Sequence, residues 1–184
     1  MRIVAGIYGS RRLEAPQGMD TRPTQDKIRE ALFSSLGGFF DGGRVLDLYA
    51  GSGAIGFEAL SRGMEEAVFC DVSAAAIAVI RRNAEALKEE RIRILKMKAR
   101  KAIALLGKER KKFDLVYLDP PYKKQENEAI LIALLEEGLL NPGAEVAVES
   151  LKEESFPEEI GALRRKKESS YGITKISYYR MAQE

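Results

Sequence analysis

Short apolar runs alternate with stretches of helical periodicity along most of this chain. Five runs are typical of buried strands: residues 45–49, 67–70, 92–96, 113–118 and 145–149. Four further stretches carry apolar residues at helical spacing: residues 54–61, 74–87, 99–106 and 127–137. Repeated alternation of this kind predicts an α/β fold, in which a parallel sheet is covered by helices on both faces.

The two ends of the chain have different patterns. Near the C-terminus, Leu163–Glu168 and Ile173–Arg180 flank a turn and predict an antiparallel hairpin that closes the sheet. Within the second run, Tyr178 and Tyr179 point to opposite faces, so at most one of them is expected in the core.

The first forty residues form a separate N-terminal pattern. Arg2–Ile7 and Arg11–Leu13 flank a short turn and predict a small hairpin. Thr24 is a good N-cap for a helix over Gln25–Leu36, and the glycine pair that begins at Gly37 is expected to end that helix.

Length and composition fit one domain. We expect a single domain over residues 1–184, made of an N-terminal extension (1–40) and a core (41–184). With one cysteine, Cys70, and no histidine, the chain has no internal disulfide, no cysteine-rich zinc site and no imidazole base. Without those ligands we expect no metal site. The chain has neither an apolar run of membrane-spanning length nor a signal-peptide core, so we expect a cytoplasmic protein.

The net charge of +2 hides a strong segregation of charge along the chain. Residues 91–112 hold ten Lys or Arg against one acid, and residues 126–160 hold ten Asp or Glu against one base. A second basic run occupies residues 164–167. This separation predicts either one positive face that engages phosphates or charges that average out on the surface, and charge alone favours neither.

The first chemical signal is a glycine-rich stretch directly after the first predicted strand. Gly51, Gly53 and Gly56 match the dinucleotide fingerprint G-x-G-x-x-G, and Asp71 ends the next strand, where a carboxylate can hold ribose hydroxyls. A dinucleotide and S-adenosylmethionine therefore compete as ligands. Asp47 favours S-adenosylmethionine, because a carboxylate there suits the cationic methionine end and would repel a pyrophosphate. The spacing to Asp71 disfavours a turn that binds nothing.

The second signal, Asp119-Pro120-Pro121-Tyr122, ends the fourth predicted strand, where open α/β sheets bind ligands. The prolines leave carbonyl acceptors without N–H donors, Asp119 adds a carboxylate, and Tyr122 offers a flat face on which a base can stack. These groups can accept both protons of a planar amine and orient its lone pair. We take Asp119, Pro120, Pro121 and Tyr122 as the candidate catalytic residues for methylation of a base amine.

Three blocks of the sequence resemble the bacterial 16S ribosomal RNA guanine-N2 methyltransferases of the RsmD type. They are Thr21–Thr24, Asp47–Gly63 and Asp119–Tyr122, with a weaker fourth from Tyr171 to Arg180. The resemblance implies a class I methyltransferase with a Rossmann-like, seven-stranded sheet, mostly parallel with antiparallel C-terminal strands. It also implies S-adenosylmethionine as cofactor. The implied substrate is a guanine N2 amine in 16S RNA of the small ribosomal subunit or its assembly intermediate.

The resemblance also bears on the remaining candidate residues. Such enzymes often carry an acid after the third strand that reads the cofactor's adenine, but Lys98–Lys101 has none, so backbone groups of Ala99 or Arg100 are the alternative. For RNA binding the candidates are Arg11, Arg12, Arg22 and Thr24. Arg22 could contact an RNA phosphate or the cofactor's carboxylate, and the resemblance favours such a contact over a plain surface position at the start of the helix. The candidate cofactor-binding residues are Asp47, Tyr49, Ala50, Gly51, Ser52, Gly53, Asp71, Val72, Ala99 and Arg100.

Several other functions stay open at this point. A dinucleotide-dependent oxidoreductase is disfavoured by Asp47 and by the Asp-Pro-Pro-Tyr motif, and a non-catalytic RNA-binding module needs neither motif. DNA adenine-N6 enzymes share Asp-Pro-Pro-Tyr but usually add a target-recognition domain, for which this chain is short. Protein glutamine methylation is disfavoured by Asp rather than Asn at position 119.

Overall fold

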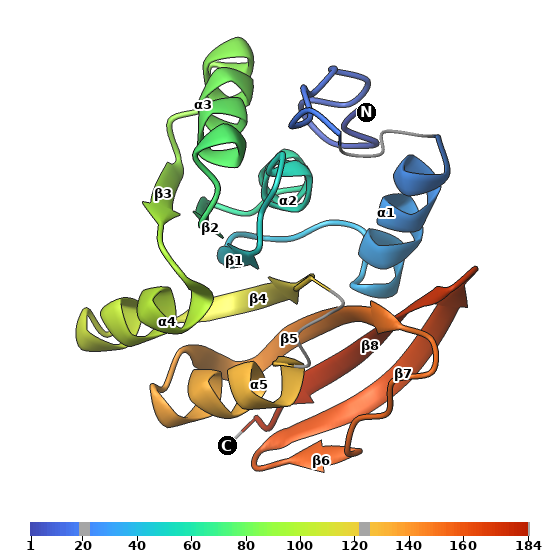
Figure 1. The fold of residues 1–184 in the computed structure, drawn as a ribbon, viewed down its shortest axis with the longest axis vertical. Helices are drawn as coiled ribbons and strands as arrows, with labels where there is room; N and C mark the ends of the chain where they lie inside the picture. Colours follow the sequence, from blue (N-terminus) through green and yellow to red (C-terminus); the bar gives the residue numbers. More distant parts are fainter. Residues whose placement is uncertain (19–22, 122–125, 184) are drawn as a thin grey trace.

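The computed structural model describes residues 1–18, 23–121 and 126–183 and has the expected alternation of strands and helices (Figure 1). The helices in this part of the chain are α1 (Pro23–Ser35), α2 (Ala54–Ser61), α3 (Ala74–Leu87), α4 (Ala99–Lys108) and α5 (Asn127–Glu136). The strands are β1 (Arg44–Leu48), β2 (Glu66–Asp71), β3 (Ile92–Lys96), β4 (Phe113–Leu118), β5 (Leu140–Leu151), β6 (Glu159–Ile160), β7 (Leu163–Tyr171) and β8 (Thr174–Met181). They form one sheet in the order β3-β2-β1-β4-β5-β8-β7-β6.

The pairing confirms a Rossmann-like sheet. β1 to β5 pair in parallel, and β8, β7 and β6 continue the sheet with antiparallel pairing. The sheet has one strand more than the seven that the resemblance implies. The extra strand is β6, whose two residues pair with β7 at the sheet's edge, and so short a segment has no periodicity to predict it.

Each face of the sheet is covered by its own set of helices (Figure 1). α1, α2 and α3 pack with the N-terminal segment on one face, where Phe33, Phe57 and Ile80 are buried. α4 and α5 cover the other face through residues such as Ile103 and Leu131. Within the described part of the chain, no helix combines the length and the apolar character needed to cross a membrane.

Three boundaries differ from the predictions. The N-terminal hairpin is reduced to one bridge between Arg2 and Arg12. α1 begins at Pro23, so Thr24 lies inside the helix and the prediction that it is the N-cap was wrong; proline suits the first helical position because that N–H has no helical partner. β5 begins at Leu140 rather than at residue 145. The prediction began too late because a Pro-Gly pair, here at Pro142, usually indicates a turn, although this pair lies within the strand.

Candidate active site

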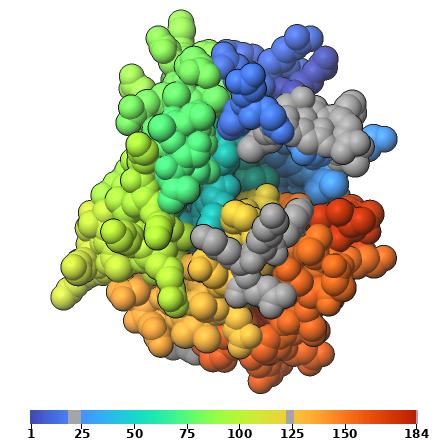
Figure 2. Space-filling model, in the orientation of Figure 1, coloured from blue at the N-terminus to red at the C-terminus, as the bar shows by residue number. Residues whose placement is uncertain are grey.

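The carboxyl ends of β1 and β4 lie side by side at the point where the strand order reverses, and two cavities open there. A cavity of about 670 Å³ extends from the ends of β1 and β2 to the start of α4. A second cavity, of about 210 Å³, lies between the glycine turn and α1. Tyr49, Gly51 and Asp119 line both cavities, so the cavities adjoin at these residues. In Figure 2 the cyan surface of the turn is recessed between the green surface of α3 and the blue N-terminal region.

Three residues of the glycine turn have positive φ angles, a backbone conformation that residues other than glycine rarely adopt. Tyr49, Gly51 and Gly53 have φ angles of 62°, 57° and 80°. The Gly51 N–H donates to Oδ2 of Asp71 at 2.9 Å, and the Ser73 N–H donates to Oδ1 of the same carboxylate at 2.9 Å. Asp71 therefore fixes the turn in addition to lining the larger cavity.

Nearly all of the predicted cofactor-binding residues line one cavity or both. Those at the larger cavity are Tyr49, Gly51, Asp71, Val72, Ala99 and Arg100. Those at the smaller cavity are Asp47, Tyr49, Ala50, Gly51 and Ser52. Gly53 lines neither; a Cβ at this position would come within 2.8 Å of the Phe57 ring. The absence of a side chain at Gly53 allows the positive φ angle of the turn and the close packing of the turn against Phe57 on α2.

Four acidic or phenolic side chains line the smaller cavity near the carboxyl ends of β1, β4 and β5. This acidic row consists of Asp47, Tyr117, Asp119 and Glu149. Burial, with the nearby carboxylates of Glu149 and Asp47, raises the pKa of Asp119 well above its ordinary value. Burial also raises the pKa of Asp47, although an N–H bond from Gly56 opposes this shift. Carboxylates in such a row attract donors and hold protons more tightly than exposed ones.

The smaller cavity is lined on its other side by α1, of which the sequence analysis had assigned only Thr24 to the site. The residues that face the cavity are Gln25, Ile28, Arg29 and Leu32. Their spacing places them on one face of a helix, and this pattern was available in the sequence. Tyr117 and Glu149 were also missed, as were Met97, Lys98 and Glu126 at the larger cavity.

The candidate catalytic motif is described in part. Asp119 and Pro120 lie in the wall of the larger cavity, Pro121 lines it from an exposed position, and Tyr122 lies outside the described residues. Among the described residues of this motif, Asp119 is the one that carries a carboxylate into the cavity wall.

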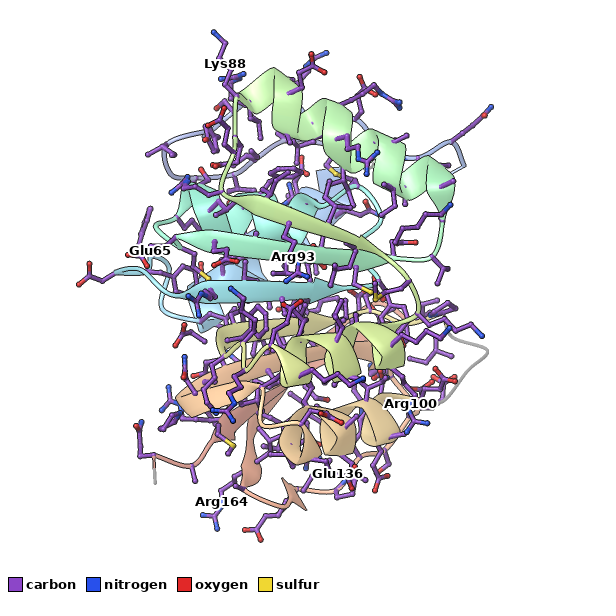
Figure 3. The ribbon with its side chains drawn as sticks, turned by 90° about the vertical axis from the view of Figure 1, so that its left-hand side faces the viewer. Glu65, Lys88, Arg93, Arg100, Glu136 and Arg164 are labelled. Atoms are coloured by element: carbon purple, nitrogen blue, oxygen red, sulfur yellow. The ribbon has the colours of Figure 1, made fainter. Side chains whose placement is uncertain are left out.

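Of the four candidate RNA-binding residues, two lie apart from the cavities, and Thr24 lies in α1 directly before Gln25, which lines the smaller cavity. Arg11 and Arg12 are exposed on the N-terminal segment, and Arg11 Nη2 donates to the carbonyl of Ala86 at 2.7 Å. Arg22 lies outside the described residues. Arg100, at the start of α4, lies near the carboxyl ends of the strands, whereas Arg164 lies at the opposite end of the molecule from α3 (Figure 3).

Comparison with known proteins identifies the family. Residues 1–180 match the family described as "Conserved hypothetical protein 95". The chain belongs to this family. A relative from Haemophilus influenzae, named "Ribosomal RNA small subunit methyltransferase D", is 31% identical over 183 residues, which is 97% of this chain and 93% of the relative.

Solved structures share the fold of this chain. The Escherichia coli protein yhhF superimposes with a TM-score of 0.88 at 30% identity, covering 100% of this chain and 99% of the other. SMU.776, solved in complex with SAH, shares the fold with a TM-score of 0.66 at 13% identity, covering 88% of this chain and 50% of the other. The family match and the shared fold therefore cover the same part of the chain, which includes the sheet and the cavities at the ends of its strands.

Proposed function

We propose that the protein transfers a methyl group from S-adenosylmethionine to the N2 amine of a guanine in 16S ribosomal RNA. The substrate is the small ribosomal subunit or its assembly intermediate in the cytoplasm. Asp119 carries this proposal, because it lines both cavities. A base amine in the smaller cavity can donate to Asp119 while the larger cavity holds the methyl donor, so the reacting groups meet at one wall. Family membership and the name of the Haemophilus relative support the RNA substrate.

The proposal is tested on ribosomal RNA from cells that lack this protein. Mass mapping of 16S RNA is expected to show one guanine that has lost its N2 methyl group and regains it when the gene is restored. Unchanged methylation of 16S RNA in the deletion strain would contradict the proposed substrate.

The larger cavity fits S-adenosylmethionine, which supplies the electrophilic methyl group when bound. The Asp71 carboxylate can accept ribose hydroxyls, and the side chain of Val72, 61% exposed, offers an apolar surface to the adenine. Ala99 and Arg100 begin α4, so their N–H groups have no partner within the helix and can donate to the adenine ring. Asp47, beside the glycine turn, suits the methionine ammonium. The SAH complex of SMU.776 supports this class of cofactor.

Asp71→Ala is expected to weaken S-adenosylmethionine binding about 10- to 150-fold, because hydrogen bonds to a charged acceptor contribute about 1.5–3 kcal/mol. Calorimetry measures the affinity, with NAD as a competitor that should have no effect. Asp41→Ala makes the same change at an exposed position and should bind normally. Tight NAD binding with no S-adenosylmethionine binding would refute the cofactor assignment.

Reversing Arg11 and Arg12 to glutamate is expected to weaken binding to small-subunit RNA and to flatten its salt dependence. Each lost phosphate contact lowers the slope of log K against log salt by about 0.7–0.9. Filter binding over a salt series measures both quantities. Arg110→Glu with Arg164→Glu makes the same charge change in the two basic runs and shows, by comparison, whether those runs also contact RNA. An Arg11/Arg12 variant that methylates subunits at the wild-type rate would show that the N-terminal segment is not an RNA arm.

A further inference from the structure

Glu149 lies in the acidic row, but the methyl transfer proposed above assigns it no role. Strand pairing aligns Tyr117 on β4 with Ala147 on β5. Glu149 lies two residues further along β5, and Asp119 lies two residues after Tyr117, directly beyond the end of β4 at Leu118, so the two residues occupy corresponding positions on neighbouring strands. Both carboxylates line the smaller cavity. A base that reaches Asp119 therefore meets a second carboxylate beside it.

Glu149 is held in place by a neighbour on the adjacent strand. The hydroxyl of Tyr117 donates to Oε2 of Glu149. A carboxylate accepts at both oxygens, so Oε1 can accept from a group in the cavity. Burial raises the pKa of Glu149, although the bond from Tyr117 opposes that shift, and Glu149 in turn raises the pKa of Asp119. A ligand that donates N–H groups to both carboxylates favours their charged forms.

Two adjacent acceptors match one edge of one base. Guanine places its N1–H directly beside the 2-amino group, which gives two neighbouring donors. Adenine places the lone pair of N1 beside its amine, and that lone pair would face a carboxylate. We propose that Glu149 accepts the N1–H of the target base while Asp119 accepts an N–H of its 2-amino group, so the pair selects guanine. The inference rests on the proposed function and adds a specificity-determining residue to it.

The base 2-aminopurine keeps the 2-amino group that is methylated but has a lone pair in place of the N1–H. It therefore tests recognition of the N1–H while the methyl acceptor stays the same. Small subunits are reconstituted from ligated 16S RNA that carries guanine or 2-aminopurine at the mapped target. The wild-type protein is expected to prefer guanine by at least about 100-fold in kcat/KM, since a buried acceptor rejects an analogue without its donor. In Glu149→Gln the amide can donate to N1 of 2-aminopurine, so the preference should fall at least about tenfold.

Two further variants control the experiment. Glu145→Gln makes the same change in the middle of β5, where Glu145 accepts from Arg180 at 2.6 Å, and should keep the wild-type preference. Tyr117→Phe removes the hydroxyl that positions Glu149 and should lower the preference in part, a readout that loss of stability alone would not move. It also keeps the test valid if Glu149→Gln folds poorly.

The outcomes separate this inference from the proposed function. Equal wild-type rates on guanine and 2-aminopurine would overturn the role of Glu149 and leave the methyltransferase assignment intact. A preference that is unchanged in both Glu149→Gln and Tyr117→Phe would do the same. Failure of the wild-type protein to methylate guanine in small subunits would overturn the proposed function and this inference with it.

Discussion

Replacing Asp119 by alanine is expected to lower the single-turnover rate of methylation by about 10²–10³-fold while cofactor affinity stays near wild type. A base amine is a poor nucleophile because its lone pair is delocalised into the ring, and positive charge grows on its nitrogen during attack. The Asp119 carboxylate, in the wall shared by the two cavities, is placed to orient the amine and to stabilise that charge. Because burial raises the pKa of Asp119, this carboxylate can also take the proton that the methylated amine loses.

Single-turnover methylation of small subunits with saturating S-adenosylmethionine measures this effect. Asp119→Asn keeps an acceptor oxygen without the charge and should fall between wild type and Asp119→Ala. Asp41→Ala, the same substitution at an exposed position, should react normally. Calorimetry on each variant confirms that the cofactor still binds. Turnover near the wild-type rate in Asp119→Ala would leave the proposed mechanism without its central residue.

Local signals in the sequence were enough to predict the sheet and the cofactor side of the site. The first four strands were predicted to within one residue at each end, because each is a short apolar run that ends at a turn or a helix. The glycine turn was also predictable, since a glycine and an aspartate near strand ends carry a ligand-binding signature by themselves. Gly51 and Asp71 do line the larger cavity together.

Features that depend on contacts between distant segments were not predictable in this way. Tyr178 and Tyr179 are 2% and 0% exposed, so the expectation that at most one is core was wrong. Both are buried because β8 lies inside the sheet with protein on each face, and alternation then no longer separates inside from outside. Glu149 lies thirty residues after Asp119 along the chain, and only the pairing of β4 with β5 brings it to the site.

Glu58 is the clearest such case, because its carboxylate is completely buried and joins three separate segments. It accepts from the backbone N–H groups of Val4 at 2.8 Å and Ala5 at 3.1 Å. It also pairs with Arg62 at 2.8 Å and with Arg29 of α1 at 3.4 Å. Both guanidinium side chains are only 4% exposed. Glu58 on α2 thus connects the N-terminal segment with α1, which lines the smaller cavity.

Replacing Glu58 by alanine is expected to lower the free energy of unfolding by about 3–5 kcal/mol, because it leaves two buried cations and two N–H groups without this acceptor. Such a loss is a large share of the 5–15 kcal/mol that is typical of a domain. Urea unfolding measures it, with Glu66→Ala as the control. The Glu66 pair with Arg44, at 2.9 Å, is 30% and 43% exposed, so its removal should cost at most about 1 kcal/mol. Equal stability of the two variants would show that the Glu58 cluster contributes no more than a surface ion pair. A selective loss in Glu58→Ala would show that buried charge secures the N-terminal segment and α1 against the core.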